Sequence, residues 1–297
     1  MEQSGTDQNR TIGAALKQNI KTKTPVIYNI LLILQQEFIN VKKECNEYIA
    51  FKKAIHQNVP YFGIPGGLST TGKRRNYMEK FIKEEVKKKQ GEFFKVLEIG
   101  SWLGSSTILW ADAIKKYNDG KGLVICVDPW VPYIKPENIG YSKTPLKMEK
   151  ALKKNRVLPL FLHNIQASRL ESIIKPYKGT SEELLPTLRD EEFNFVYVDG
   201  SHLYSDVLKD LKRCGRLVSQ NGVLGGDDLE LQKNEIDVVN AEKQKEKDYI
   251  IDTKTNKPFH PGVSIAVGEF FSNRVSNYEG FWIMRKMQGE WRQVEIS

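Results

Sequence analysis

The chain has 297 residues, of which 40% are hydrophobic, so it can bury one large core, and we expect one principal domain with appendages. Its 45 basic and 37 acidic side chains leave a formal charge of +8, which is typical of a solvated basic surface; without a base-reading motif, it argues against a nucleic-acid partner. Three scattered cysteines exclude a disulfide framework and suit the cytoplasm, and the apolar run from Pro25 to Leu34 is too short to cross a bilayer, so we expect no membrane partner.

The N-terminal part of the chain has the pattern of helices and loops rather than of a sheet. Residues 1–24 are polar and rich in turn formers, which predicts a mobile leader. Apolar residues recur at spacings of three and four over 25–58, which predicts a helix, and a glycine-rich loop over 61–75 precedes a Lys/Glu-rich helix at about 76–90. We therefore predict an N-terminal helical cap with a lid loop over residues 25–91.

From residue 92 the pattern changes to short apolar runs that alternate with amphipathic helical segments. Such alternation is typical of parallel strands that helices cover on both faces. Two late runs flank Gln288-Gly289 as a closing hairpin, and the full set of runs is 94–100, 122–128, 172–177, 193–199, 221–225, 280–286 and 291–296. We predict a doubly wound, Rossmann-like α/β domain over 92–297 with a mostly parallel seven-stranded sheet. The charged insertion at 230–257 is expected to lie on the surface.

A glycine-bearing turn connects the first predicted strand to the next helix, over Glu98-Ile-Gly-Ser-Trp-Leu-Gly-Ser-Ser106. Gly100 allows a tight turn, Gly104 allows the helix to approach the sheet, and the free N–H groups at the helix start face the crevice at the strand ends. Such a turn suits a nucleotide-like ligand. A dinucleotide fingerprint would need another glycine in place of Trp102, which argues against a nicotinamide cofactor.

Asp128 ends the second predicted strand. A carboxylate at this position can accept hydrogen bonds from both hydroxyls of a ribose. Alone, a glycine turn or a strand-ending aspartate is more often structural, as a plain turn or a helix cap. In this order and spacing, the two elements together predict a cofactor site.

The pattern Glu98-x-Gly-x-Trp-x-Gly-x-Ser106 resembles the first motif of class I S-adenosylmethionine-dependent methyltransferases, in particular the catechol and caffeoyl-CoA O-methyltransferase branch, in which an aromatic residue also replaces the middle glycine. The resemblance covers about 92–297. It implies that the glycine turn lies along the methionine part of the cofactor, that Asp128 holds its ribose, and that Ser181 lies at its adenine edge. The implied cofactor-binding residues are Glu98, Gly100, Ser101, Trp102, Gly104, Ser105, Ser106, Asp128, Trp130, Ser181 and Asp199.

Three aspartates follow the fourth and fifth predicted strands. Asp199 begins Asp-Gly-Ser-His202, and Asp227 and Asp228 follow the next strand. Because neighbouring parallel strands deliver their carboxyl ends to one crevice, these side chains can converge, and three oxygen donors would suit Mg²⁺. The alternative is that each aspartate caps a turn or the helix that follows it.

Metal-dependent O-methyltransferases resemble this arrangement, with an aspartate after the fourth strand and an Asp-Asn pair after the fifth. The resemblance implies a Mg²⁺ ion at Asp199, Asp227 and Asp228, although Asp228 stands where those enzymes have asparagine. His202 falls at the position of their lysine base. An imidazole, with an ordinary pKa of about 6.5, can accept a hydroxyl proton near neutral pH.

The Asp-Gly-Ser-His and Gly-Asp-Asp sequences, with His260-Pro-Gly-Val263, also resemble a microbial branch of sugar- and antibiotic-tailoring O-methyltransferases and cephalosporin-hydroxylase-like proteins. Together the resemblances imply an S-adenosylmethionine-dependent O-methyltransferase, assisted by Mg²⁺, that methylates a hydroxyl of a small molecule or glycan. His202 and Asp199 are the implied catalytic residues, and most of the rate would come from positioning and electrostatics.

Other interpretations stay open at this stage. The aspartates could be structural in a metal-independent methyltransferase, and the basic charge leaves a nucleic-acid-directed methyltransferase or a non-catalytic cofactor-binding scaffold as lesser alternatives. Trp130 either stacks on an acceptor ring or packs under the lid. The insertions at 131–158 and 230–260 are expected to shape the acceptor pocket, but no pattern identifies the acceptor or decides whether the chain forms a homo-oligomer.

Overall fold

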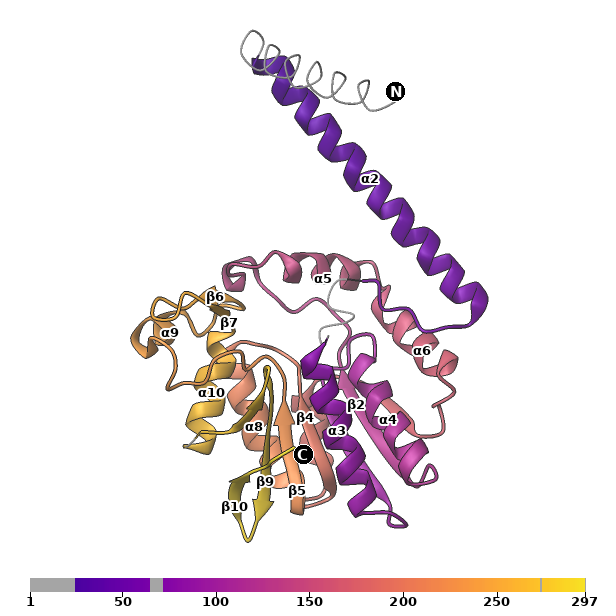
Figure 1. Ribbon diagram of the computed structural model, residues 1–297, viewed down its shortest axis with the longest axis vertical. Coiled ribbons are helices and arrows are strands. Elements are labelled where there is room, and N and C mark those ends of the chain that lie inside the picture. The colour runs from indigo at the N-terminus through magenta and orange to yellow at the C-terminus, as the bar shows by residue number, and fades with distance from the viewer. Residues whose placement is uncertain (1–24, 65–71, 273, 297) are drawn as a thin grey trace, which may run out of the picture. The chain divides into compact units, whose positions relative to one another are not determined.

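The computed structural model describes residues 25–64, 72–272 and 274–296 (Figure 1). The predicted leader at 1–24 and the centre of the predicted lid loop lie outside the described residues. The chain divides after Gln57 into two units. Helix α2 (Pro25–Gln57) is the described part of the first unit and confirms the helix predicted there.

The second unit is built on a sheet whose first strand in the sequence is an interior strand rather than an edge strand. The strands run in the order β10-β9-β5-β4-β1-β2-β3, with β1 to β5 parallel and β9 antiparallel to β5. Because the chain moves outward from β1 to β3 and then crosses back to β4, the order reverses between β1 and β4, where such sheets bind ligands. The strands are β1 (Phe94–Ile99), β2 (Gly122–Asp128), β3 (Ile174–Lys178), β4 (Phe193–Val198), β5 (Val218–Gly226), β8 (Ser276–Tyr278), β9 (Phe281–Met287) and β10 (Glu290–Gln293).

The sequence predicts seven strands of this sheet, and the described sheet has eight. The closing hairpin of β9 and β10 is confirmed at Gln288-Gly289. The additional strand β8 has three half-buried residues and pairs only with β9. A strand this short carries no apolar run, so the pattern that reveals buried strands does not reveal it.

Helices cover both faces of the sheet, as the alternating side chains of β4 require. Phe195 packs against Phe81 of α3 (Lys73–Lys88) and Trp110 of α4 (Ser105–Tyr117). The alternate residue Val196 belongs to the apolar core formed with α8 (Tyr204–Leu217) and α10 (Pro261–Phe271). A strand buried on both faces is apolar along its whole length, which explains the continuous hydrophobic runs in the sequence.

Helix α3 lies in the same unit as the sheet, although the sequence analysis groups it with the N-terminal cap. Arg285 of β9 contacts the Glu85 carboxylate of α3 through both terminal nitrogens, at 2.7 and 2.9 Å. Tyr77 packs on Tyr278 of β8, with ring centroids 5.0 Å apart. These contacts hold α3 at the edge of the sheet that carries the late strands.

The remaining short elements lie in the two insertions and the connections. The insertion at 230–257 is not merely a surface segment, because it has an apolar cluster that includes Leu231, Ile236, Ala241 and Ile250. No helix in the described part of the chain is both long and apolar enough to cross a membrane. The elements are α5 (Thr144–Lys153), α6 (Val157–Ala167), α7 (Ser181–Leu184), α9 (Val238–Gln244), β6 (Ile250–Ile251), β7 (Pro258–Phe259) and two 3₁₀ turns, Pro136–Asn138 and Leu185–Thr187.

We expect Gly100→Ala to cost more stability than Gly91→Ala. Both glycines have positive φ, 83° and 88°, so alanine strains each backbone by about 1 kcal/mol. At Gly91 a Cβ would meet no described atom within 4 Å, whereas at Gly100 it would lie 2.0 Å from the carbonyl oxygen of Asp199. Relieving that overlap should add about 1–3 kcal/mol. Urea unfolding of both variants checks this, and equal losses would contradict the close backbone contact.

Candidate functional site

A cavity of about 300 Å³ lies at the carboxyl ends of β1, β2 and β4. The residues that end or follow these strands, Gly100, Asp128 and Asp199, all line it. Trp102 from the glycine turn and Ser181 from the start of α7 line it as well. Five of the sequence-predicted cofactor residues therefore meet in one cavity at the point where the strand order reverses.

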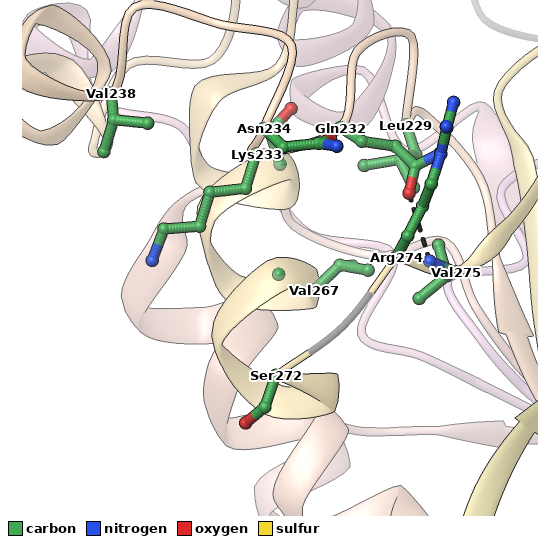
Figure 2. A pocket seen from close by; sticks show the side chains of 11 residues that line it. Leu229, Gln232, Lys233, Asn234, Val238, Val267, Ser272, Arg274 and Val275 are labelled. Carbon is green, nitrogen blue, oxygen red and sulfur yellow. Dashed lines mark hydrogen bonds between the residues drawn. The ribbon is translucent and has the colours of Figure 1, made fainter.

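A second cavity, of about 350 Å³, lies between α10 and the chain that follows β5 (Figure 2). Its lining includes Lys233, Val267 and Ser272, but none of the residues that the sequence predicts as functional. Figure 2 shows Gln232 beside Val275, whose backbone N–H donates to the Gln232 side chain at 3.1 Å. Its lining holds no acidic or histidine side chain, so we place the candidate site in the first cavity.

The carboxylate of Asp128 holds the glycine turn in place. Its Oδ2 accepts hydrogen bonds from the backbone N–H groups of Ser101 and Trp102, at 3.0 and 2.9 Å, and its Oδ1 accepts one from the N–H of Trp130 at 2.6 Å. Burial raises the pKa of Asp128 above its ordinary value, although the three N–H donors oppose this. A carboxylate has about four acceptor positions, so one position on Oδ1 is left for a ligand hydroxyl.

Glu98 does not line the cavity, so the structure gives no support to the expected direct contact with a cofactor. Its side chain is fully buried and accepts hydrogen bonds from the Thr107 hydroxyl and from Trp110 Nε1, the latter at 3.0 Å. Burial raises the pKa of this carboxyl. Glu98 therefore holds α4 on β1 and acts on the site only through the position of the glycine turn.

Several other predicted cofactor residues support the turn rather than line the cavity. Trp130 packs on Phe161 with ring centroids 4.8 Å apart, and its Nε1 donates to the carbonyl of Trp102 at 2.9 Å, which favours the packing interpretation over acceptor stacking. Ser105 and Ser106 belong to the first turn of α4, and Gly104, at φ 84°, precedes them. A Cβ at Gly104 would lie 3.1 Å from the ring of Phe161.

Ser181 connects the cavity wall to a buried carboxyl. Its hydroxyl donates to Asp210 of α8 at 2.5 Å, and both residues line the cavity. Thr180 places Ser181 by a capping box, in which Thr180 and Glu183 each accept a hydrogen bond from the other's backbone N–H. Burial raises the pKa of Asp210 to about 6.

Two of the three predicted metal-binding aspartates, Asp199 and Asp228, lie close together. Asp199, His202 and Asp228 lie close enough that one ligand-type atom from each falls within 4.8 Å of the others. Asp227 instead contacts Arg74 of α3, at 2.7 Å between its Oδ1 and a terminal nitrogen of the guanidinium. We use the term acid cluster for the carboxylates at this edge of the sheet: Asp199, Asp227, Asp228, Glu230 and Asp248.

His202 lies between two carboxylates of the acid cluster. Its Nδ1 is 2.8 Å from Asp248 and its Nε2 is 3.0 Å from Asp228. Burial lowers the pKa of His202, but the two carboxylates outweigh burial and raise it well above its ordinary value. An imidazolium has no lone pair to accept a proton, so this arrangement does not support the predicted base role of His202 near neutral pH.

Asp199 places a carboxyl group of raised pKa beside the cavity. It lines the cavity, and burial together with the charges of Asp227 and Asp228 raises its pKa well above its ordinary value. The pKa of Asp227 rises to about 7 through burial and Asp228. The pKa of Asp228 falls instead, since His260, His202 and Arg74 stabilise its charge against the effect of burial.

Four residues of this site are not predicted from the sequence. Arg74 falls in the glycine-rich loop predicted over 61–75, whereas the structure places it in the first turn of α3. Glu230 and Asp248 belong to the insertion expected on the surface. His260, whose Nδ1 lies 3.1 Å from Glu230, was noted only as part of a family resemblance. No local pattern predicts these residues: α3 and the insertion bring Arg74, Asp248 and His260 to the acid cluster from distant parts of the chain, and Glu230, two residues after Asp228, begins the insertion expected on the surface.

Residues 97–229 match the family model of a methyltransferase domain. The O-methyltransferase NovP is similar in structure, with a TM-score of 0.52 and 15% identity over 73% of this chain and 80% of NovP, which shows a common fold. Two further solved structures are the O-methyltransferase TomG from Streptomyces achromogenes (TM-score 0.43, 15% identity, 79% and 86% covered) and an O-methyltransferase from Bacillus cereus (0.43, 16%, 92% and 97%). A comparison with curated proteins found no match.

Ionisation of Asp210 should make the protein less stable as pH rises. Its folded pKa of about 6 lies above the unfolded value of about 3.9, so the folded state binds the extra proton between these values. Stability should therefore fall from about pH 4 to about pH 6, by on the order of 3 kcal/mol in total. Asp210→Asn should remove most of this dependence and be more stable than the wild type at pH 7.5.

Denaturant unfolding at pH 4.5 and 7.5 measures this difference. Asp206→Asn is the comparison variant, because Asp206 lies on the same helix and lines the same cavity; its charge adds less than burial to the raised pKa of Asp210, so this variant should keep most of the pH dependence. If Asp210→Asn and the wild type share one pH dependence, Asp210 is not the group that titrates.

Proposed function

We propose that this chain is a class I S-adenosylmethionine-dependent methyltransferase that transfers the methyl group to a hydroxyl oxygen of a small molecule or a sugar, which the match to a methyltransferase domain supports. The observation that carries the proposal is the cavity in which the glycine turn, Asp128 and Asp199 meet. Its lining includes Asp128, a carboxylate suited to a ribose hydroxyl, and Asp199, a carboxyl group of raised pKa. Cofactor binding and proton removal are therefore adjacent.

The residues that line the cavity fit S-adenosylmethionine. Asp128 retains an acceptor position for a ribose hydroxyl, and Ser181 lines the same cavity. Within the described part of the chain, Nε1 of Trp102, which lines the cavity, is buried without a hydrogen-bond partner, so the turn carries a donor that a ligand could satisfy. Gly100 lets the turn approach the carbonyl of Asp199, where a Cβ would lie 2.0 Å from its oxygen.

The chemistry requires one proton to leave the acceptor. The bound cofactor supplies an electrophilic methyl group on a positively charged sulfur, and the acceptor oxygen forms the new C–O bond as the C–S bond breaks. Asp199 accepts the hydroxyl proton in our proposal when its carboxyl group is ionised, because it lines the cavity and a raised pKa makes the ionised carboxylate a stronger base than an ordinary aspartate. The turn and the strand ends would contribute mainly by holding the two reactants in line.

A Mg²⁺ requirement is the second candidate. It is favoured by the grouping of Asp199, His202 and Asp228, which could hold a divalent ion with Asp248 orienting the imidazole through Nδ1. The predicted set of three aspartates does not fit as it stands, since Asp227 is paired with Arg74. Because Arg74 and His202 already bring positive charge to Asp228, the arrangement favours methyl transfer without a metal, and we derive no step through one.

Asp128→Ala should weaken binding of S-adenosylmethionine at least tenfold. The variant loses the ribose acceptor and frees the three backbone N–H groups that fix the turn. Isothermal titration calorimetry on the full chain measures the affinity. Asp112→Ala is the matched control, because Asp112 is an exposed partner of Lys116 on α4. Equal affinities for all three proteins would place the cofactor elsewhere.

Asp199→Asn should lower turnover by about 10²-fold or more while leaving affinity for S-adenosylmethionine within a few-fold of the wild type. The amide has the shape of the carboxyl group but does not accept a proton. Formation of S-adenosylhomocysteine, measured with a panel of phenols, catechols and hexoses as acceptors, provides the assay. Full activity of the Asp199→Asn variant would exclude Asp199 as the base.

The same assay tests the metal requirement. Turnover in EDTA without added metal supports the metal-independent form, and loss restored by Mg²⁺ supports the second candidate.

A further inference from the structure

We propose that Arg74 is the resident cation of the acid cluster: its guanidinium occupies the carboxylate oxygens that a divalent metal ion would need, and its removal opens a metal site. The contacts of Arg74 carry this inference. Only one consequence of this inference rests on the proposed function, namely that methyl transfer proceeds without added metal.

Helix α3 is held on the sheet by contacts that do not involve Arg74. Phe81 packs on Phe195 with ring centroids 5.0 Å apart, and Glu85 is bound by Arg285. Tyr77 packs on Tyr278. The first turn of α3 therefore lies beside the acid cluster whatever residue stands at position 74, and the direction of the guanidinium is not needed to dock the helix.

The guanidinium reaches three carboxylates at once. One terminal nitrogen lies 2.7 Å from Asp227 Oδ1 and 3.4 Å from Asp228 Oδ1, and the other lies 3.8 Å from Glu230 Oε1. The Arg74 Nε donates to the backbone carbonyl of Glu279. The Arg74 side chain is 15% exposed and that of Asp227 is fully buried, so these charges are paired where water screens them little.

The lack of a side chain at Gly280 leaves room for the guanidinium of Arg74. A Cβ at Gly280 would lie 2.1 Å from a terminal nitrogen of Arg74, and the residue has φ 98°, which favours glycine. The same turn supplies the carbonyl that Arg74 binds. The loop between β8 and β9 therefore fits a guanidinium, with its planar set of donors, better than a hydrated metal ion.

Each oxygen of Asp228 has a positively charged partner in this arrangement. Arg74 lies at Oδ1 and His202 lies at Oδ2, while Arg74 also covers Asp227 Oδ1. A dication at these oxygens would face the guanidinium across a few ångströms of poorly solvated space, and like charges so close repel strongly. Arg74 and a metal ion bound by Asp227 and Asp228 are therefore mutually exclusive.

The test is Mn²⁺ binding to the metal-free full-length chain, followed by electron paramagnetic resonance of the free ion. The wild type should bind Mn²⁺ only weakly, without saturation over the titration, whereas Arg74→Gln should show a saturable site with a dissociation constant at least tenfold below the highest free Mn²⁺ concentration used. Arg75→Gln is the matched control, because Arg75 is the next residue of the same helix and contacts Glu79 and Ser105 instead. Arg74→Lys, which retains a positive charge, should stay close to the wild type.

A site gained in Arg74→Gln should disappear in the double variant Arg74→Gln/Asp228→Asn, which assigns it to the acid cluster. Tight Mn²⁺ binding by the wild type would overturn the proposal, and this result does not depend on the folding of any variant. Equal binding by Arg74→Gln and Arg75→Gln, with circular dichroism showing both folded, would overturn it too. Metal titration needs no acceptor, so failure of the methyl-transfer proposal leaves this result interpretable.

Discussion

The close approach of two strand ends governs the rest of this structure. The backbone at Gly100 lies against the carbonyl of Asp199, so that β1 and β4 open into one cavity at the point where the strand order reverses. Only a residue without Cβ allows this contact. The start of the glycine turn and the first aspartate of the acid cluster therefore line the same cavity.

The glycine turn is held in place from several directions. Asp128 binds its backbone N–H groups, Trp130 binds the carbonyl of Trp102, and Glu98 fixes the helix into which the turn leads. These side chains explain why a pattern shared with cofactor-binding proteins includes residues that do not line the cavity. A loop that must present its N–H groups to a ligand has to be rigid before the ligand arrives, because ordering it on binding would cost affinity.

Charge compensation is the second constraint. Five carboxylates lie together at one edge of a buried sheet. Arg74 from α3 and two imidazoles, His202 and His260, pair with members of this group. Buried charges require partners of the opposite sign. The internal partners leave Asp199 with a raised pKa beside the cavity, and proton transfer in our proposed mechanism depends on that property.

The sequence by itself determined the sheet and the strand-end residues that line the candidate cavity, because both depend on local patterns. Continuous apolar runs mark strands buried on both faces, and strand-ending residues such as Gly100, Asp128 and Asp199 must meet wherever parallel strands end together. Only the tertiary structure decided the partners of those residues. Arg74 is far from Asp227 in the chain and Asp248 is far from His202, so their contacts arise from the docking of α3 and of the insertion, which no short pattern encodes.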